Sequence, residues 1–381
     1  MIVCHLILKN WRNFQAVDVS LKERVFLIGP NASGKSNFLD AFRFLRDIAK
    51  DGGGLQKAVE DRGRLPKIRC LSARRSSNVE IEVHLAESSQ EPVKWRYAIG
   101  ITQEKGGRRR PKLVYERVWS GNDLILSRPD KSDNKDEERL TQTHLEQINS
   151  NVDFREVAGF LTSIQYMHLV PQLLRYPEAF PGQEIPGDPF GKRFLENIAK
   201  TSDKTRTARL KRIESALHAV VPQLKELSFI KDETGAPHLE AVYEHWRARG
   251  AKQREDQFSD GTLRLIALLW SLQESKSLLL LEEPELSLNA EIVKKLAPMI
   301  SRLQRQTRRQ VVLSTHSPDL LSDKGIGGEE VLILEPGTEG TQVRAASSNE
   351  EIKNLLDSGM SIADAALPTT NPQTALTTWS I

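Results

Sequence analysis

The stretch that decides the fold is Val25–Ser36, which reads VFLIGPNASGKS. Four apolar residues end at a glycine, as in a strand that is buried on both faces of a parallel sheet. The remainder matches the pattern G-x-x-x-x-G-K-[ST] at every fixed position. In this pattern glycines let backbone N–H groups surround phosphate oxygens, the lysine adds a positive charge, and the hydroxyl is offered to Mg²⁺. We therefore predict a phosphate-binding loop and, after it, a helix whose N-terminus faces the anion.

Three further apolar runs predict strands that join 25–28 in the same sheet. They lie at 278–281, 311–313 and 331–334. Apolar side chains at helical spacing follow Gly261 and Asn289, and Pro298 is expected to kink or shorten the second of these helices. Strands that alternate with helices in this way predict an α/β fold with a parallel core sheet.

The middle of the chain has a different pattern. Residues 79–101 and 112–126 alternate between apolar and polar side chains, which predicts antiparallel strands. Residues 129–139 are highly charged and are expected to form an exposed loop, whereas 190–218 read as helical. Residues 346–381, rich in small and polar side chains, are expected to form a weakly ordered tail with one short helix.

Composition limits the kinds of protein that the chain can be. Its 381 residues include 54 basic and 51 acidic side chains, so the formal charge is only +3. This near balance argues against a strongly basic nucleic-acid coat but allows local basic patches. No apolar run reaches the roughly 18 residues of a membrane helix. Two cysteines, Cys4 and Cys70, make neither a disulfide framework nor a four-ligand metal site, which favours a reducing cytoplasm.

Three other motifs place reactive side chains beside predicted strands or helices. Glu282 and Glu283 end the second apolar run, where P-loop proteins hold a metal-binding acid and a second acid can polarise the attacking water. His316 comes just after the third run. Ser259 suits a helix N-cap, and Gly261 permits close backbone approach. Each motif alone is also compatible with a purely structural role.

The order of the motifs is more specific than any one of them. The phosphate-binding loop is followed by a long insertion, Ser-x-Gly before a helix, the acid pair and then the histidine. This order resembles the ABC-type ATPase superfamily, and within it the SMC, RecF and OLD-like ATPases. The resemblance is carried by NWRNF at 10–14, GPNASGKSN at 29–37, EEPELSL at 282–288 and STHSP at 314–318. It implies an α/β ABC-ATPase head with a P-loop parallel core sheet, an antiparallel β subdomain and a helical insertion lobe.

That resemblance implies one ATPase domain over residues 1–345, followed by the tail over 346–381. Its parts are 1–75 with the P-loop, 76–130 with antiparallel strands, 131–255 as the helical insertion lobe, and 256–345 with the signature, Walker B and histidine motifs. The insertion has no heptads, which excludes a long SMC-type coiled coil in this chain. No Glu and Asp-x-Asp cluster follows His316, so the chain is not expected to contain the TOPRIM nuclease domain of OLD proteins.

The resemblance also implies ATP and Mg²⁺ as ligands, sandwiched between the two heads of a dimer. The residues implied to surround the triphosphate are Gly29, Pro30, Asn31, Ala32, Ser33, Gly34, Lys35, Ser36 and Asn37. Ser36 and Glu282 would hold Mg²⁺. Glu283 would act as general base or orient the water, and His316 would contact the γ-phosphate.

Further residues of the implied site come from other parts of the chain. Ser259 and Gly261 would reach the nucleotide from the opposite subunit, where their helix dipole adds positive potential. Gln172 is the candidate for the Q-loop glutamine of the family, and Gln165 is the alternative.

Three positions depart from the pattern of the family. Glu282 and Asn289 each replace an aspartate, and Asp260 replaces the first signature glycine and brings a negative charge near ATP. These departures allow slow hydrolysis, with ATP acting mainly as a clamp that joins two subunits. They also allow a nucleotide-gated scaffold that does not hydrolyse ATP.

The first functional hypothesis is a cytoplasmic ATPase, a homodimer or higher homo-oligomer, that senses a trigger or controls a separately encoded effector. Family analogy suggests a TOPRIM-type nuclease as effector, in anti-phage defence. The second hypothesis is a RecF-like ATPase of DNA maintenance, with DNA as partner. Its candidate contacts are Arg108, Arg109 and Arg110, or Arg302, Arg305, Arg308 and Arg309. Solvated charged faces are the simpler explanation of both clusters, and neither hypothesis involves a membrane.

Overall fold

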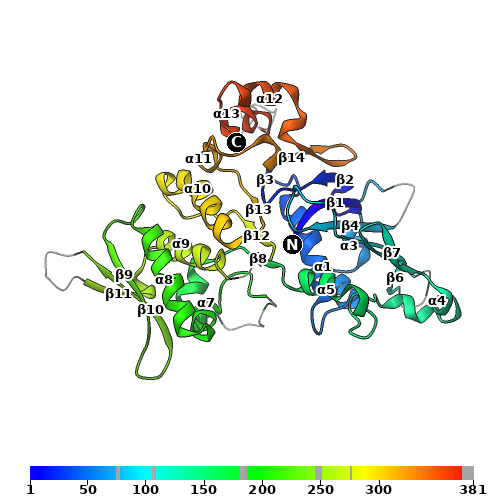
Figure 1. Ribbon diagram of the computed structural model, residues 1–381, viewed down its shortest axis with the longest axis horizontal. Helices are drawn as coiled ribbons and strands as arrows, with labels where there is room; N and C mark the ends of the chain where they lie inside the picture. The colour runs from blue at the N-terminus through cyan, green and yellow to red at the C-terminus, as the bar shows by residue number, and fades with distance from the viewer. Residues whose placement is uncertain are drawn as a thin grey trace, which may run out of the picture.

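The computed structural model describes residues 1–73, 78–104, 106, 109–180, 185, 187–244, 251–274 and 277–370 (Figure 1). Three sheets and the helices around them make up this part of the chain. Arg108, one of the candidate DNA contacts, and residues 371–381 of the expected tail lie outside it.

The central sheet has six strands in the order β15-β14-β3-β13-β12-β8. The strands are β3 (Arg24–Ile28), β8 (Gln165–Met167), β12 (Leu279–Glu282), β13 (Val311–Ser314), β14 (Val331–Gly337) and β15 (Gly340–Ala345). Every pairing is parallel except that between β14 and β15. The four strands predicted from apolar runs are therefore confirmed as β3, β12, β13 and β14.

Alternate side chains of these central strands enter two different cores. Val25 and Leu27 pack on one face of the sheet, whereas Phe26 and Ile28 pack on the other. Since both faces are covered, a polar residue at any position of β3 would face an apolar core. This is why the strand reads as an unbroken apolar run.

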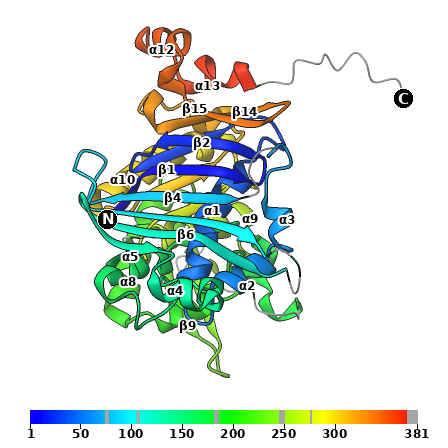
Figure 2. The ribbon, with the colours of Figure 1, turned by 90° about the vertical axis from the view of Figure 1, so that its right-hand side faces the viewer.

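The second sheet is antiparallel, in the order β2-β1-β4-β5-β6-β7 (Figure 2). Its strands are β1 (Ile2–Trp11), β2 (Phe14–Ser20), β4 (Val79–Ala86), β5 (Trp95–Gln103), β6 (Pro111–Ser120) and β7 (Asp123–Arg128). The strands predicted within 79–101 and 112–126 are confirmed. Helix α1 (Lys35–Ala49) lies between the two sheets, and its buried Phe38, Phe42 and Leu45 belong to the core that they share.

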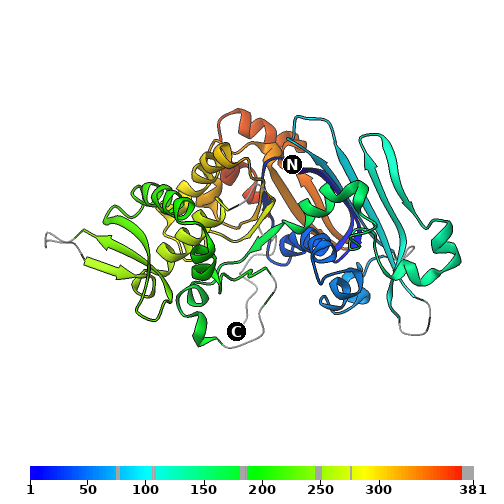
Figure 3. The ribbon, with the colours of Figure 1, turned by 60° about the horizontal axis from the view of Figure 1, so that its bottom comes forward.

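The other face of the central sheet is covered by helices of a separate lobe (Figure 3). They are α7 (Phe194–Lys200), α8 (Asp203–Leu217), α9 (Asp260–Ser271) and α10 (Ala290–Thr307). A three-stranded antiparallel sheet extends this lobe, with β9 (Leu224–Lys231), β10 (Pro237–Tyr243) and β11 (Ala251–Arg254). The sequence did not predict this sheet. Helix α10 runs unbroken through Pro298, so the expected shortening is wrong.

Shorter helices connect these elements. They are α2 (Leu55–Glu60), α3 (Leu65–Ile68), α4 (Lys131–Lys135), α5 (Arg155–Thr162), α6 (Pro171–Arg175), α11 (Pro318–Leu321), α12 (Glu350–Asp357) and α13 (Ile362–Ala365). No helix in the described ranges is long and apolar enough to span a membrane.

The charged segment 129–139 is mostly exposed, as its composition predicts, but it is not a loop. It forms α4 and the start of a 3₁₀ turn, and Asp133 is fully buried. The guanidinium of Arg128 donates to Asp133 and to Glu116, with N–O distances of 2.8 and 3.1 Å. The buried ion pair between Arg128 and Asp133 anchors α4, whose other side chains stay in solvent.

The segment after residue 346 also differs from the expected tail. It contains two helices, α12 and α13, where one was predicted. Ile352, Ile362 and Ala366 are buried and join the core beneath α11 and β14. Apolar residues at helical spacing anchor this segment despite its small and polar composition.

Candidate nucleotide-binding site

The loop between β3 and α1 has the backbone that a phosphate-binding loop requires. Gly29, Ala32 and Gly34 have φ angles of 155°, 63° and 100°. A Cβ atom on Gly34 would lie 2.1 Å from Nδ2 of Asn13, and one on Gly29 would lie 2.5 Å from the carbonyl oxygen of Leu334. Both glycines are therefore needed for conformation and for packing.

Lys35 lies folded against this loop. Its ammonium donates to the carbonyl oxygens of Gly29 and Pro30 at 3.0 and 3.1 Å. Burial lowers the pKa of Lys35, while Glu283, Glu282 and other nearby carboxylates oppose the shift. The Lys35 side chain therefore lies on the carbonyl side of the loop, within the influence of the carboxylates at the edge of the sheet.

A pair of asparagines holds the loop in place. The amide of Asn13 donates to the carbonyl of Ser33 at 2.9 Å, and the amide of Asn37 donates to Oδ1 of Asn13 at 2.8 Å. Asn37 therefore supports the loop from behind, and Asn13 is a positioning residue that the sequence analysis missed. Asn31 and Ala32 are exposed at the tip. The hydroxyl of Ser33 is buried with no partner in the described structure.

Ser36 and Glu282 come together at the carboxyl ends of the parallel strands. The Ser36 hydroxyl donates to one oxygen of Glu282, and the Tyr166 hydroxyl donates to the other. Burial and the neighbouring Glu282 raise the pKa of Tyr166. The guanidinium of Arg43 covers its ring, 4.0 Å from the centroid. Tyr166 was missed because only the pairing of β8 with β12 brings it beside the acid.

Glu283 and His316 also lie side by side. Their closest atoms, Oε1 and Nε2, are 3.6 Å apart, and each side chain is about one-third exposed. Glu283 has a φ of 44°, and its N–H donates to the carbonyl of Ser314 on β13 at 3.1 Å. The pKa of His316 is lowered by burial and by Lys35, with Glu283 acting in the opposite direction. The two predicted groups therefore share one edge of the sheet with Lys35.

Glu285, like Asn13 and Tyr166, was not predicted from the sequence as a residue of the site. One of its oxygens accepts from the Thr315 hydroxyl at 2.6 Å and from the backbone N–H of His316 at 3.2 Å. Its other oxygen is buried with no partner among the described residues, and burial raises its pKa. Glu285 thus fixes the backbone that carries His316.

The signature-like segment begins helix α9. The Ser259 hydroxyl caps the helix by accepting from the N–H of Thr262 at 3.1 Å. A Cβ atom on Gly261 would lie 2.7 Å from the carbonyl oxygen of Ser287. Close approach to this neighbouring loop is therefore the structural reason for a glycine at this position.

Asp260 does not face solvent as an isolated charge. Its Oδ1 lies 2.7 Å from Nη2 of Arg175, and its Oδ2 accepts from the amide of Gln172 at 3.3 Å. The structure therefore places Gln172 against the signature segment. Gln165 accepts from the guanidinium of Arg309 at the other end of β8. Within the described structure neither glutamine contacts Lys35, Ser36 or Glu282, and the Q-loop assignment stays a prediction.

Most of the chain matches a known protein family. Residues 24–322 match the family described as "AAA domain, putative AbiEii toxin, Type IV TA system". No protein with curated annotation matches the sequence significantly.

Two solved structures with a similar fold are SMC heads. One is an SMC head bound to the C-winged helix domain of ScpA, with a TM-score of 0.56 and 14% identity, covering 90% of this chain and 98% of that one. The other, from Pyrococcus furiosus, is an SMC head with an extended coiled coil, bound to the C-terminal domain of ScpA. It has a TM-score of 0.51 and 12% identity, and the match covers 94% of this chain and 99% of that one. Since the family match spans most of the chain, the chain belongs to this AAA family, and its fold is that of an SMC head.

Proposed function

We propose that the chain binds and hydrolyses Mg²⁺–ATP as a pair of identical subunits, and that this pairing controls a separately encoded effector. The observation that carries the proposal is the grouping of Lys35, the Ser36–Glu282 pair and the Glu283–His316 pair at one edge of the parallel sheet. Ligands of open α/β sheets bind at this carboxyl edge.

The loop residues fit a triphosphate. The backbone conformations of Gly29, Ala32 and Gly34 form a turn of the kind in which N–H groups converge on an anion. The buried hydroxyl of Ser33, without a partner in the described structure, is a further donor. Lys35 supplies the charge that such a ligand needs, and α1 adds the positive end of its dipole.

Ser36 and Glu282 fit Mg²⁺ because both present oxygen. Mg²⁺ is usually held by one or two carboxylates together with substrate phosphates and water. A dedicated cage is therefore unnecessary, in accord with the lack of a larger metal-binding cluster among the described residues. When bound there, Mg²⁺ would neutralise charge on the phosphates.

Glu283 and His316 have complementary roles in this proposal. Glu283 accepts the proton of the attacking water or orients that water, because its carboxylate is accessible at the edge of the site. His316, kept neutral by burial and by Lys35, offers an N–H to the terminal phosphate without competing for the proton that Glu283 takes. Ser259 and the amino end of α9 complete the pocket from the opposite subunit.

The nature of the effector rests on family likeness. The description of the matched family includes a toxin and a toxin–antitoxin system, which supports a role beside a second protein, and we propose a TOPRIM-type nuclease in anti-phage defence. The DNA-maintenance alternative has less support. Arg309 is buried with its guanidinium bonded to backbone carbonyls, and Arg110 pairs with Glu104 and Glu138.

Two variants test the proposal. Lys35→Ala is expected to abolish ATP binding, measured with a fluorescent ATP analogue, because it removes the charge at the loop. Glu283→Gln is expected to bind ATP, release no phosphate and accumulate as a dimer in light scattering. If ATP binds no better to wild type than to Lys35→Ala, the site is not a nucleotide site. If Glu283→Gln releases phosphate at the wild-type rate, Glu283 is not the acid that activates water.

A further inference from the structure

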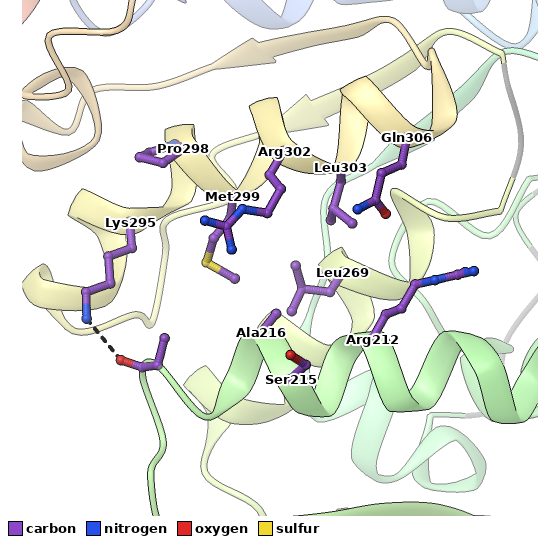
Figure 4. Close-up of a pocket in the computed structure, with 11 residues that line it drawn as sticks. Arg212, Ser215, Ala216, Leu269, Lys295, Pro298, Met299, Arg302, Leu303 and Gln306 are labelled. Atoms are coloured by element: carbon purple, nitrogen blue, oxygen red, sulfur yellow. Dashed lines mark hydrogen bonds between the residues drawn. The ribbon is translucent and has the colours of Figure 1, made fainter.

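A groove lies on the helical lobe, away from the nucleotide site, between α8 and α10 (Figure 4). Its cavity measures about 450 Å³. On α10 the lining residues recur three and four positions apart from Lys295 to Gln306, and on the α8 side they do so from Arg212 to Ala219. Leu269 of α9 forms the floor. The walls of the groove are thus faces of α8 and α10, and its floor belongs to α9.

The interior of the groove is apolar. Met299 and Leu303 of α10 face Ala216 and Leu269 across the gap (Figure 4). Met299 and Leu303 form a second apolar strip on α10. The first strip consists of Val293, Leu296 and Ile300, which are buried in the core. Met299 and Leu303 are only partly buried. Met299 and Leu303 thus leave part of their apolar surface open beside the core-facing side of α10.

The rim of the groove is positive and lacks acids. Arg212, Lys295 and Arg302 line it, and no lining residue is acidic. Lys295 donates to the carbonyl oxygen of Ala219 at 2.9 Å, and Arg212 reaches an amide oxygen of Gln273 at 3.5 Å. Arg302 makes no hydrogen bond or ion pair with any described residue. Three cations without a carboxylate are notable in a chain whose overall charge is nearly balanced.

The shape selects the kind of occupant. From Lys295 to Gln306 the wall of α10 is about 16 Å long at 1.5 Å per residue, which is the length of three helical turns. Two flanking helices offer ridges and grooves into which a third helix packs. An amphipathic helix with apolar anchors three and four residues apart would cover the strip, and acidic residues beside the anchors would meet the three cations.

We propose that this groove is the docking site for an acidic amphipathic helix of a partner protein. The proposal rests on the proposed function for its biological role, because it supplies the surface through which a separately encoded effector would be held. The groove itself, however, is formed by the single chain and needs no nucleotide.

The position of the groove connects it to the nucleotide site. Leu269 lies on α9, the helix that Ser259 caps, about 15 Å along the helix from that cap. The α10 wall belongs to the helix that Asn289 caps. A helix in the groove would therefore contact α10 and α9, and the first turn of α9 faces the opposite subunit in the proposed dimer. If those helices shift on pairing, partner binding and ATP binding must influence each other reciprocally.

A peptide probe tests the docking site directly. The probe is a fluorescein-labelled peptide of about 18 residues, with Leu at positions i, i+3, i+4 and i+7, Glu beside them and Ala at the remaining positions to favour a helix. Binding to the full chain is followed by fluorescence anisotropy without nucleotide. We expect saturable binding that weakens about tenfold or more in Arg302→Glu and in Leu303→Asp. The matched control is Arg305→Glu, which makes the same charge change on α10 outside the groove and should bind as wild type.

The outcomes separate this inference from the proposed function. A peptide with Lys in place of Glu should not bind. Equal binding of both peptides, or equal loss in Arg302→Glu and Arg305→Glu, would show general charge attraction and overturn the proposal. If dodecanoate displaces the peptide at an equal concentration, the groove binds a small amphiphilic anion instead of a helix. This result would also overturn the proposal. Because no step uses ATP, failure here leaves the Lys35→Ala and Glu283→Gln tests intact, and failure of those leaves the groove intact.

Discussion

The sharpest prediction concerns Arg175 as the counter-charge of the signature segment. Its Nη2 lies 2.7 Å from Oδ1 of Asp260 and 2.6 Å from the carbonyl oxygen of Phe258. In the proposed dimer this segment approaches the triphosphate of the opposite subunit. Without Arg175, Asp260 would bring an uncompensated negative charge to a polyanion. Arg175→Ala is therefore expected to weaken ATP-dependent pairing.

The size of the effect follows from the exposure of the two side chains. A hydrogen bond to a charged group contributes roughly 1.5–3 kcal/mol. Arg175 is 15% exposed but Asp260 is 38% exposed, so solvent screens part of the interaction. We expect a loss of about 1–2 kcal/mol, which corresponds to a roughly 5- to 30-fold increase in the ATP concentration needed for half-maximal pairing.

The assay is light scattering of the Glu283→Gln dimer as ATP is titrated. The double variant Arg175→Ala/Asp260→Gly removes both charges and should return close to the starting ATP dependence. Lys200→Ala, which breaks an exposed pair of the same lobe at 3.9 Å, serves as the control and should have no effect. If Arg175→Ala pairs normally, or if the double variant is as impaired as the single one, charge compensation is not the role of Arg175.

Three further predictions concern other groups. The pKa of His316 should lie below its ordinary value and should rise in Lys35→Ala, because the variant removes a neighbouring positive charge. NMR titration of the imidazole ring measures this pKa. A lower pKa in Lys35→Ala than in wild type would contradict the prediction. Tyr166→Phe removes the hydroxyl bonded to Glu282 and should raise the Mg²⁺ concentration for half-maximal hydrolysis about tenfold, whereas an unchanged Mg²⁺ dependence would exclude this role. Arg128→Leu leaves the buried carboxylates of Glu116 and Asp133 without their counter-charge. It should lower the free energy of unfolding, measured in urea, by about 3–5 kcal/mol. A variant as stable as wild type would refute this prediction.

The central sheet could be predicted from the sequence because burial on both faces leaves a simple signal. Strands β3, β12 and β13 consist mostly of apolar residues, and β14 begins with four of them. Strand β8 has only three residues, Gln165–Met167, which form no such run. The strands of the small sheet also escaped prediction, because β9 carries charged residues and has only a weak alternation of burial.

The candidate site was predictable where adjacent residues carry the chemistry and unpredictable where partners come from distant segments. The residues of the phosphate-binding loop are contiguous in sequence, and so are the two acids Glu282 and Glu283. Arg175 meets Asp260 only through the packing of α6 against α9, and Glu285 meets His316 only through the turn after β12. Similarly, charge pattern alone could not show that Asp133 would be buried beside Arg128.

The three departures from the family pattern each have a local partner in the fold. Glu282, with its longer arm, accepts from Ser36 and from Tyr166 with different oxygens. Asp260 is neutralised by Arg175, and Asn289 caps α10 by accepting from the N–H of Glu291 at 2.9 Å. Such compensation serves ATP-dependent pairing whether or not ATP is hydrolysed. Phosphate release by the wild-type chain therefore distinguishes the proposed ATPase from a nucleotide-gated scaffold that does not hydrolyse ATP.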